Sequence, residues 1–417
     1  MGALTASPRL RKILRLSGAA LLGLYGLLLI PDAEPVPPPP ATRGPFAWNQ
    51  DARWKTLEAR FAAARGGDRD GVLAGLARGA ALVSRLAGPP LDADDPVLDE
   101  VEEAVFSLGP RVAASPADLP AYVSLASSMR DAVKDQSIRW DMGAPSTRHR
   151  LYRLLYGGRA AVEEALSQAP AGTVPALTPG RDEPSRAPSA VVHGVRIHSG
   201  DILLSRGGAP TSALIARGND FPGNFSHVAL VHVDGASSKV SVIEAHIEAG
   251  VAVATIDGYL ADRKLRILAL RPRADLPALV RDPMLPHRAA TAALESARSR
   301  HIPYDFSMDF QDRSRLFCSE VASAAYGEAG VRLWMGLSTL SSPGLLKWLS
   351  AFGVRNSLTQ EPSDLEYDPQ LRVVAEWRDP ETLLQDRLDN AVIDAMLEGA
   401  ERGSGWSTTS SCCRRCG

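Results

Sequence analysis

The chain has 417 residues, a formal net charge of −2 and an apolar content of 45%. This length and composition are sufficient for two domains, each with its own apolar core. The near-neutral charge, without a basic patch interleaved with aromatic residues, excludes nucleic acid as a partner.

The N-terminal residues 1–31 have the pattern of an export signal. Four cations at positions 9, 11, 12 and 15 precede an uncharged run, rich in Leu and Gly, at residues 16–30. Fifteen apolar residues fit a signal-peptide core better than a membrane span, but no small-x-small cleavage site follows. We therefore expect either a cleaved signal or an uncleaved anchor in a bacterial inner membrane, with the remainder of the chain in the periplasm.

A proline-rich linker is predicted at residues 32–47, and a helical domain follows at residues 48–171. A second linker, interrupted by prolines, is predicted at residues 172–190. Within the helical domain, Ala-rich amphipathic stretches are separated by Gly, Pro and Asp. They lie at residues 54–64, 71–86, 95–108 and 147–166.

Short apolar runs alternate with turns in the domain predicted at residues 191–380, which indicates an antiparallel sheet with helices packed beside it, an α+β class. The predicted strands are 228–233, 240–245, 251–256 and 265–270, and the predicted helices are 288–298 and 318–329.

A C-terminal helix is expected at residues 381–402. Leu384, Leu388, Val392 and Met396 share one face of it, and we expect that face to pack on the body of the protein. The remaining residues 403–417 contain Cys412, Cys413 and Cys416, and we predict a disordered tail without a catalytic role.

Cys318 is the only cysteine before position 412, and it stands where an irregular stretch meets an Ala-rich helical run. A thiol in the first turn of a helix is expected to have a lowered pKa, because the helix dipole stabilises the thiolate. His227 begins a predicted strand and can therefore lie over a helix N-terminus. The alternative interpretation makes Cys318 a small buried hydrophobe and His227 a structural core residue.

Acyl transfer also requires a group that orients the base and donors for the oxyanion. Glu244 lies on the strand predicted to follow that of His227, so the two side chains can be cross-strand neighbours. His246 shares the face of Glu244 and is the alternative third member. The backbone N–H of Cys318 and the hydroxyl of Tyr304 are candidate oxyanion donors, although Tyr304 can equally be a packed wall of the site.

Six short motifs occur in an order that resembles the circularly permuted papain-like amidases, the YiiX-like branch of the NlpC superfamily. Papain has its cysteine before its histidine, whereas a permuted chain has the order seen here. The resemblance implies Cys318 as nucleophile, His227 as general base, Glu244 as the orienting residue and Tyr304 as a wall of the site. The motifs are Ser-Gly-Asp-Ile at 199–202, Ser-His-Val at 226–228, Val-Ile-Glu-Ala at 242–245, Pro-Tyr-Asp-Phe at 303–306, Phe-Cys-Ser-Glu at 317–320 and Pro-Ser-Asp-Leu at 362–365.

This resemblance implies a permuted papain-like fold and an exported cysteine hydrolase that cleaves an amide bond in a cell-wall peptide or a lipid-linked substrate. A thiol-dependent acyltransferase, a lipid esterase and a catalytically inactive binding module are the alternatives. No metal-ligand spacing is present in the helical domain, and we expect no cofactor. The expected partners are therefore the substrate and, through residues 16–30, the inner membrane.

Overall fold

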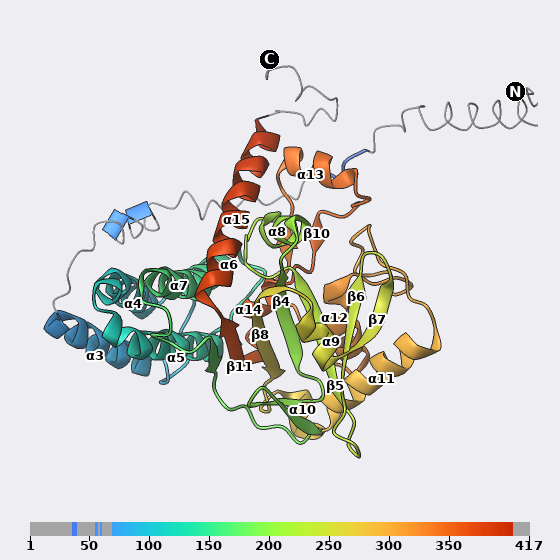
Figure 1. Ribbon diagram of the computed structural model, residues 1–417, viewed down its shortest axis with the longest axis horizontal. Helices are drawn as coiled ribbons and strands as arrows, with labels where there is room; N and C mark the ends of the chain where they lie inside the picture. Colours follow the sequence, from blue (N-terminus) through green and yellow to red (C-terminus); the bar gives the residue numbers. More distant parts are fainter. Residues whose placement is uncertain (1–35, 40–54, 57–58, 61–68, 403–417) are drawn as a thin grey trace, which may run out of the picture. The chain divides into compact units, whose positions relative to one another are not determined.

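The computed structural model describes residues 36–39, 55, 56, 59, 60 and 69–402 (Figure 1). By its internal contacts the chain divides into Met1–Val36 and Pro37–Gly417, and every element named below belongs to the second unit. The predicted export signal and the cysteine-containing tail lie outside the described residues. Within the described ranges, none of the helices combines the length and the apolar character that a membrane span needs.

A seven-stranded sheet organises the second half of the described chain (Figure 1). Its strand order is β1-β11-β8-β4-β5-β6-β7, and every neighbouring pair is antiparallel. The four strands predicted from β-branched apolar runs are present as β5 to β8, and the predicted α+β class is confirmed. The strands are β1 (Leu177–Pro179), β4 (Ile202–Gly207), β5 (His227–Val233), β6 (Val240–His246), β7 (Gly250–Thr255), β8 (Lys264–Pro272) and β11 (Leu371–Arg378).

The sheet buries both of its faces, because side chains alternate along each strand. One face carries Val228 and Leu230, and it packs against helices α11 (Leu285–Ser299) and α12 (Cys318–Glu328). The opposite face carries Ala229 and Val231 in a second apolar cluster. Strand β5 is therefore held from both sides. The second cluster also contains side chains from helix α9 (Ile256–Ala261) and from the hairpin of β2 (Ser189–Val192) and β3 (Val195–His198).

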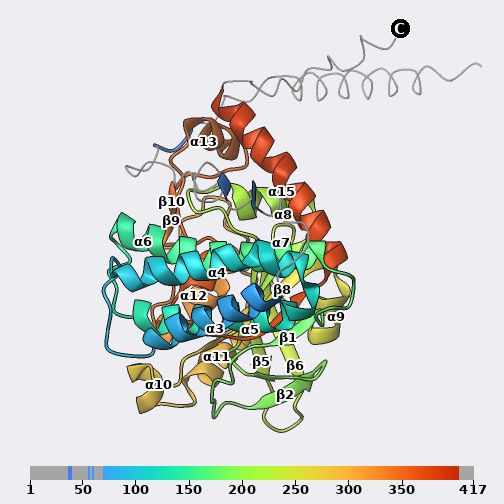
Figure 2. The same cartoon turned by 90° about the vertical axis from the view of Figure 1, so that its left-hand side faces the viewer.

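The N-terminal part of the described chain is helical, as expected, and its helices lie side by side (Figure 2). Their buried side chains belong to one apolar core. Two differences from the predicted stretches have local causes. Helix α5 was not predicted, because its buried face includes polar residues such as Lys134 and Gln136. The stretch predicted at 147–166 is interrupted by one π-helical turn. The elements are α3 (Arg69–Arg85), α4 (Pro96–Ala114), the 3₁₀ turn Pro116–Asp118, α5 (Leu119–Ser137), α6 (Pro145–Tyr152), the π turn Arg153–Gly157 and α7 (Gly158–Gln168).

Ion pairs join these helices to the sheet region. Arg159 of α7 donates to both carboxylate oxygens of Glu366, at 2.6 and 2.9 Å, and both side chains are buried. Glu163, one turn further along α7, pairs with Arg266 of β8. Because buried charges are stable only when paired, these contacts fix α7 against the sheet region. Glu366 belongs to the short helix α14 (Asp364–Tyr367).

The predicted packing of the C-terminal helix α15 (Pro380–Glu401) is wrong. Its opposite face is buried instead, because Asp386 there pairs with the fully buried Arg206, at 2.9 Å. Leaving that arginine unpaired would cost more than exposing aliphatic side chains to water. Met396 is partly buried. The other three side chains of the face that was predicted to pack, Leu384, Leu388 and Val392, are more than half exposed.

Residues 177–179, within the stretch predicted as a linker, form the edge strand β1, which pairs with β11. Its last residue, Pro179, has no backbone N–H to donate. It is tolerated because one side of an edge strand has no neighbouring strand to hydrogen-bond with. The remaining elements are α8 (Pro210–Arg217), α10 (Pro277–Arg281), β9 (Ser338–Thr339), α13 (Pro343–Ser350) and β10 (Leu358–Thr359).

Candidate active site

Cys318 is the first residue of helix α12, as the sequence predicted. Phe317 is extended (φ −87°, ψ 175°), and its N–H donates to Oε2 of Glu320 at 2.8 Å. In return, the N–H of Glu320 donates to the carbonyl oxygen of Phe317 at 3.0 Å. A Glu at the third helical position that binds the N-cap backbone in this way fixes where a helix begins. The Phe-Cys-Ser-Glu motif thus determines the position of the thiol.

The thiol of Cys318 lies against the start of β5. Its Sγ is 3.9 Å from the carbonyl oxygen of Ser226, and the backbone N–H of Val228 donates to the sulfur. These two residues flank His227. The packing of Val321 on the same core as Val228 holds the helix start at this point of the strand. The structure therefore places the predicted nucleophile beside the backbone of the predicted base.

The expected lowering of the Cys318 pKa is wrong. Burial raises the pKa of this thiol to about 12, and the hydrogen bond from the Val228 N–H only partly opposes that effect. The side chain is 4% exposed. A helix dipole stabilises a charge by about 0.3–1 kcal/mol, which is less than one pKa unit, so desolvation dominates here. The resting form of Cys318 is the neutral thiol.

His227 and Glu244 meet across two neighbouring strands. Nε2 of His227 is 2.7 Å from Oε2 of Glu244. In the pairing of β5 with β6, Glu244 is opposite Ala229, which places it diagonally across from His227 on the same face. With Nε2 bound to the carboxylate, Nδ1 is the ring nitrogen that can accept the proton of a thiol.

His246 also binds Glu244, through the other carboxylate oxygen. Its Nε2 is 3.3 Å from Oε1, and its ring stacks on that of His227 with centroids 5.7 Å apart. Burial would raise the pKa of Glu244, but the hydrogen bonds from His227 and His246 outweigh it and lower the pKa to about 2. The carboxylate is therefore ionised between two imidazoles. Of the two candidates for the third member, only Glu244 is hydrogen-bonded to His227.

A cavity of about 360 Å³ lies beside Cys318, which is one of its lining residues. Tyr304 lines the same cavity, and its ring makes an edge-on contact with Phe306. Burial raises the pKa of Tyr304 well above its usual value, so its hydroxyl remains a neutral group. The structure thus places Tyr304 in the wall of the cavity that contains the thiol.

Asp305 shapes the loop that carries Tyr304 and Phe306. Its buried carboxylate accepts hydrogen bonds from the N–H and hydroxyl of Ser307 and from the N–H of Asp309, at 2.6–2.9 Å. An aspartate that binds the following backbone in this way fixes a turn. The Pro-Tyr-Asp-Phe motif therefore has a structural explanation in the shape of the cavity wall.

Sequence reasoning missed two polar residues of this cavity, Gln360 and Glu361. Both are more than nine-tenths buried. Oε1 of Gln360 and Oε2 of Glu361 have no hydrogen-bond partner among the described residues. Burial raises the pKa of Glu361 well above its usual value, so the carboxyl group is neutral. The only feature of the sequence that could have pointed to Gln360 and Glu361 is that they directly precede the Pro-Ser-Asp-Leu motif.

That motif supports the strand which begins with His227. The hydroxyl of Ser363 accepts from the N–H of Phe225 at 3.0 Å and donates to the carbonyl oxygen of Phe225 at 3.1 Å. Gly223 must lack a side chain, because a Cβ would lie 2.1 Å from Oγ of Ser363. The segment after Pro362 thus positions the residues that lead into Ser226 and His227.

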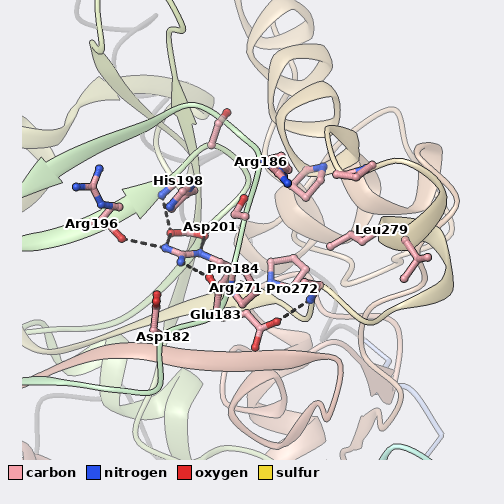
Figure 3. Close-up of a pocket in the computed structure, with 16 residues that line it drawn as sticks. Asp182, Glu183, Pro184, Arg186, Arg196, His198, Asp201, Arg271, Pro272 and Leu279 are labelled. Carbon is pink, nitrogen blue, oxygen red and sulfur yellow. Dashed lines mark hydrogen bonds and ion pairs between the residues drawn. The ribbon is translucent and has the colours of Figure 1, made fainter.

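A second pocket, of about 530 Å³, lies around Asp201 and Arg271 (Figure 3). Arg271 binds both carboxylate oxygens of Asp201, each at 2.8 Å. Two further N–H groups of Arg271 donate to the carbonyl oxygens of Glu183 and Arg196. Because each nitrogen of this guanidinium already binds the protein itself, we assign the Ser-Gly-Asp-Ile motif a structural function.

Residues 196–375 match the family model described as permuted papain-like amidase enzyme, YaeF/YiiX, C92 family. This region is a permuted papain-like amidase domain. The match covers a little less than half of the chain and includes Cys318, His227 and Glu244. No curated protein and no solved structure matches the chain. The domain is thus a hydrolase of the cysteine-peptidase type with a permuted papain-like fold.

Proposed function

We propose that this amidase domain hydrolyses its substrate with Cys318 as nucleophile, His227 as general base and Glu244 as the residue that orients the imidazole. The observation that carries the proposal is the 2.7 Å bond between Nε2 of His227 and Oε2 of Glu244, together with the contacts of the Cys318 thiol to the backbone on either side of His227. A nucleophile, a base and a group that fixes the base's tautomer are the parts that acyl transfer requires.

The reaction begins from a neutral thiol. Nδ1 of His227 takes the thiol proton as Sγ of Cys318 attacks the substrate carbonyl carbon. Collapse of the tetrahedral intermediate breaks the C–N bond, and the imidazolium returns the proton to the leaving amine. Water, deprotonated by His227, then cleaves the thioester and releases the acid and the thiol. Glu244 stabilises the imidazolium in both steps.

The backbone N–H of Cys318 is the first donor proposed for the oxyanion. It belongs to the first residue of α12, and the N–H groups of the first helical turn have no partner within their helix. Because this donor is part of the rigid helix start, it needs no reorganisation during the reaction. Tyr304, in the wall of the same cavity, is the candidate for a second donor.

Hydrolysis of a panel of aminocoumarin amides, with acyl groups from acetyl to dodecanoyl and with short peptides, tests the proposal. We expect Cys318→Ala and His227→Ala each to remove at least 99% of the activity, a decrease of about a hundredfold. His232→Asn, further along β5, is the matched control and should remain active. Activity that survives in Cys318→Ala would exclude the thiol mechanism.

We also propose that the protein is exported and remains attached to a bacterial inner membrane through residues 16–30, with the catalytic domain in the periplasm. The four cations before the apolar run support this orientation. Cleavage of the signal would instead release the domain into the periplasm. A phosphatase fusion after residue 50 should be active, and an inactive fusion there would contradict export.

An acyltransferase is a second candidate, because the thiol is buried in a predominantly apolar cavity. Limited access of water favours transfer of the acyl group to another nucleophile over hydrolysis. Analysis of the products distinguishes a hydrolase from an acyltransferase. A hydrolase releases the free acid, whereas an acyltransferase releases the free acid only when no acceptor amine or alcohol is added.

A further inference from the structure

Glu361 is a buried carboxyl group in the wall of the cavity that contains Cys318, and the proposed mechanism gives it no task. The residue is 4% exposed, and it lines the same cavity as Cys318 and Tyr304. Its atom Oε2 is buried and has no hydrogen-bond partner among the described residues. Buried polar atoms without a partner are rare and reduce stability. This one faces a cavity, where the substrate can supply the missing partner.

The backbone around Glu361 is held in place from both sides. Its N–H donates to Oδ2 of Asp364 at 3.1 Å. Its carbonyl oxygen accepts from Nε1 of Trp334 and from the N–H of Asp364, both at 3.0 Å. Asp364 is itself paired with Arg148, and it accepts from the hydroxyl of Ser338 at 2.7 Å. The carboxyl group is therefore presented from a rigid support, as a preorganised hydrogen-bond donor requires.

The carboxyl group of Glu361 is neutral. Burial, reinforced by the Asp364 carboxylate, raises its pKa well above the usual value. Among the described residues that line the cavity there is no Lys, Arg or His that would favour the ionised form. A neutral carboxyl group has an O–H that can donate, whereas a carboxylate only accepts. A carboxylic acid that an apolar site keeps neutral can therefore serve as an oxyanion donor at neutral pH.

The carboxyl group also acts on the groups that would react. Beyond the effect of burial, a negative charge on Glu361 would raise the pKa of both Cys318 and Tyr304. An ionised Glu361 would thus oppose a thiolate or an oxyanion, whereas the neutral group does not. The other acidic groups that line the cavity differ, because Asp305 accepts from its own loop and Glu248 is exposed.

We propose that Glu361 is a further catalytic residue, whose carboxyl O–H donates a hydrogen bond to the oxyanion that forms when Cys318 attacks the substrate carbonyl. The inference rests on the proposed function and adds a residue to it. In this step the C–S bond forms, the carbonyl π electrons move to the oxygen, and Nδ1 of His227 takes the thiol proton. The proton of Glu361 stays on the carboxyl group, so the proton transfers of the mechanism are unchanged.

Glu361→Leu and Glu361→Gln test this role on the aminocoumarin amide that the wild type cleaves fastest. Leucine removes the donor, and the loss of one oxyanion donor should lower kcat by about 10² to 10³. KM should change little, because the lost bond forms in the transition state. Glutamine keeps an N–H donor, so its kcat should stay within about tenfold of wild type. Glu328→Leu, at the other end of α12, is the control and should leave both constants unchanged.

Thermal unfolding separates a catalytic role from a structural one. Replacing an unpaired buried polar group by an apolar group is neutral or stabilising. We therefore expect Glu361→Leu to unfold at the same temperature as wild type or at a higher one, although its kcat falls. A kcat within about twofold of wild type in this variant would overturn the inference. A raised KM with unchanged kcat would also overturn it, because Glu361 would then be a binding group.

The pH dependence of kcat gives a test that does not need the leucine variant. Only the protonated carboxyl donates, so wild-type kcat should fall as the pH rises through the raised pKa of Glu361. Glu361→Gln cannot ionise and should lack this fall, whereas Tyr304→Phe should keep it. Circular dichroism confirms the fold of each variant at each pH. An equal fall in Glu361→Gln and wild type, or a fall that disappears only in Tyr304→Phe, would overturn the inference.

An inhibitor adduct separates this inference from the proposed function. Butanal should add through its carbonyl carbon to Sγ of Cys318, and the thiol proton moves to the former carbonyl oxygen, giving a thiohemiacetal that resembles the tetrahedral intermediate. The infrared C=O band of neutral Glu361, identified by its absence in Glu361→Gln, should shift when butanal is added and should not shift in Cys318→Ala.

The two proposals can then fail separately. If the band shifts but no amide is hydrolysed, the assignment of Glu361 stands and the hydrolase proposal fails. If Cys318-dependent hydrolysis occurs while the band stays in place and Glu361→Leu keeps its kcat, the hydrolase proposal stands and Glu361 is excluded as a donor.

Discussion

At the scale of single residues, Glu244 is the centre of the candidate site. Its two carboxylate oxygens bind two different histidines, and only His227 has chain neighbours, Ser226 and Val228, that contact the thiol. We propose different tasks for the two imidazoles. In the proposed mechanism His227 exchanges a proton with Cys318, whereas His246 binds the second oxygen and stacks on the His227 ring.

Glu244→Gln should therefore lower kcat by about 10² to 10⁴, because glutamine weakens both the tautomer preference and the stabilisation of the imidazolium. His246→Asn should reduce kcat much less. Amide hydrolysis is measured for both variants after circular dichroism has confirmed their fold. A large loss in His246→Asn with Glu244→Gln near wild type would reverse the assignment.

The raised pKa of Cys318 has a direct consequence for its reactivity. A rise from 9.0 to about 12 lowers the thiolate fraction at pH 7 by about a thousandfold. Iodoacetamide should therefore alkylate Cys318 far more slowly in the folded protein than in urea, and the rate should increase with pH throughout the range 7–10. Peptide mass spectrometry distinguishes this site from Cys412, Cys413 and Cys416. Faster alkylation in the folded protein at pH 6 would show that a thiolate is already present.

At the scale of elements, the strands and the helix that carry the site were predictable because local patterns determine them. β-branched runs predicted β5 and β6, and the change from irregular to Ala-rich sequence predicted the start of α12. The pKa of Cys318 was not predictable, since it depends on burial by distant segments. Glu361 was missed for the same reason: its significance comes from an unpaired oxygen in a cavity.

The stability of the start of α12 should fall as the pH rises from about 4.5 to about 8, because of Glu320. Burial raises the pKa of this carboxyl to about 8 in the folded protein, against 4.5 as its usual value. The stabilising contribution of the protonated carboxyl is thus complete below pH 4.5. It decreases by at most about 1.4 kcal/mol per pH unit and is lost as the pH rises through 8. Glu320→Gln keeps an acceptor for the Phe317 N–H without a charge.

We therefore expect the melting temperature of Glu320→Gln to improve relative to wild type between pH 5 and pH 9. Thermal unfolding followed by circular dichroism at several pH values measures this difference. A constant difference across the range would mean that Glu320 is ionised in the folded protein at all these pH values.

At the scale of the whole molecule, the helices before residue 170 are attached to the sheet region by buried polar contacts. Lys134 of α5 donates to the backbone carbonyl of Glu366, and Arg148 pairs with Asp364. Both contacts reach the segment that continues from Glu361 at the cavity. The sequence predicted separate helical and catalytic regions, but it could not show these pairs, because their members are more than 200 residues apart.

The pair of Arg159 and Glu366 tests whether the two regions unfold together. Both side chains are at least 96% buried, so Arg159→Met leaves a carboxylate without its main partner and should destabilise the protein by about 3–5 kcal/mol. Arg85→Met breaks the surface pair with Glu100 and is the matched control, expected to cost about 1 kcal/mol or less.

Adding Glu366→Gln to Arg159→Met should recover part of the loss, because it removes the unpaired charge. Urea unfolding followed by tryptophan fluorescence and by circular dichroism gives the free energies. Since the pair joins α7 to α14, we expect one coincident transition that shifts as a whole in Arg159→Met. A cost as small as that of Arg85→Met, or two separate transitions in wild type, would show that the helical region and the amidase domain are energetically independent.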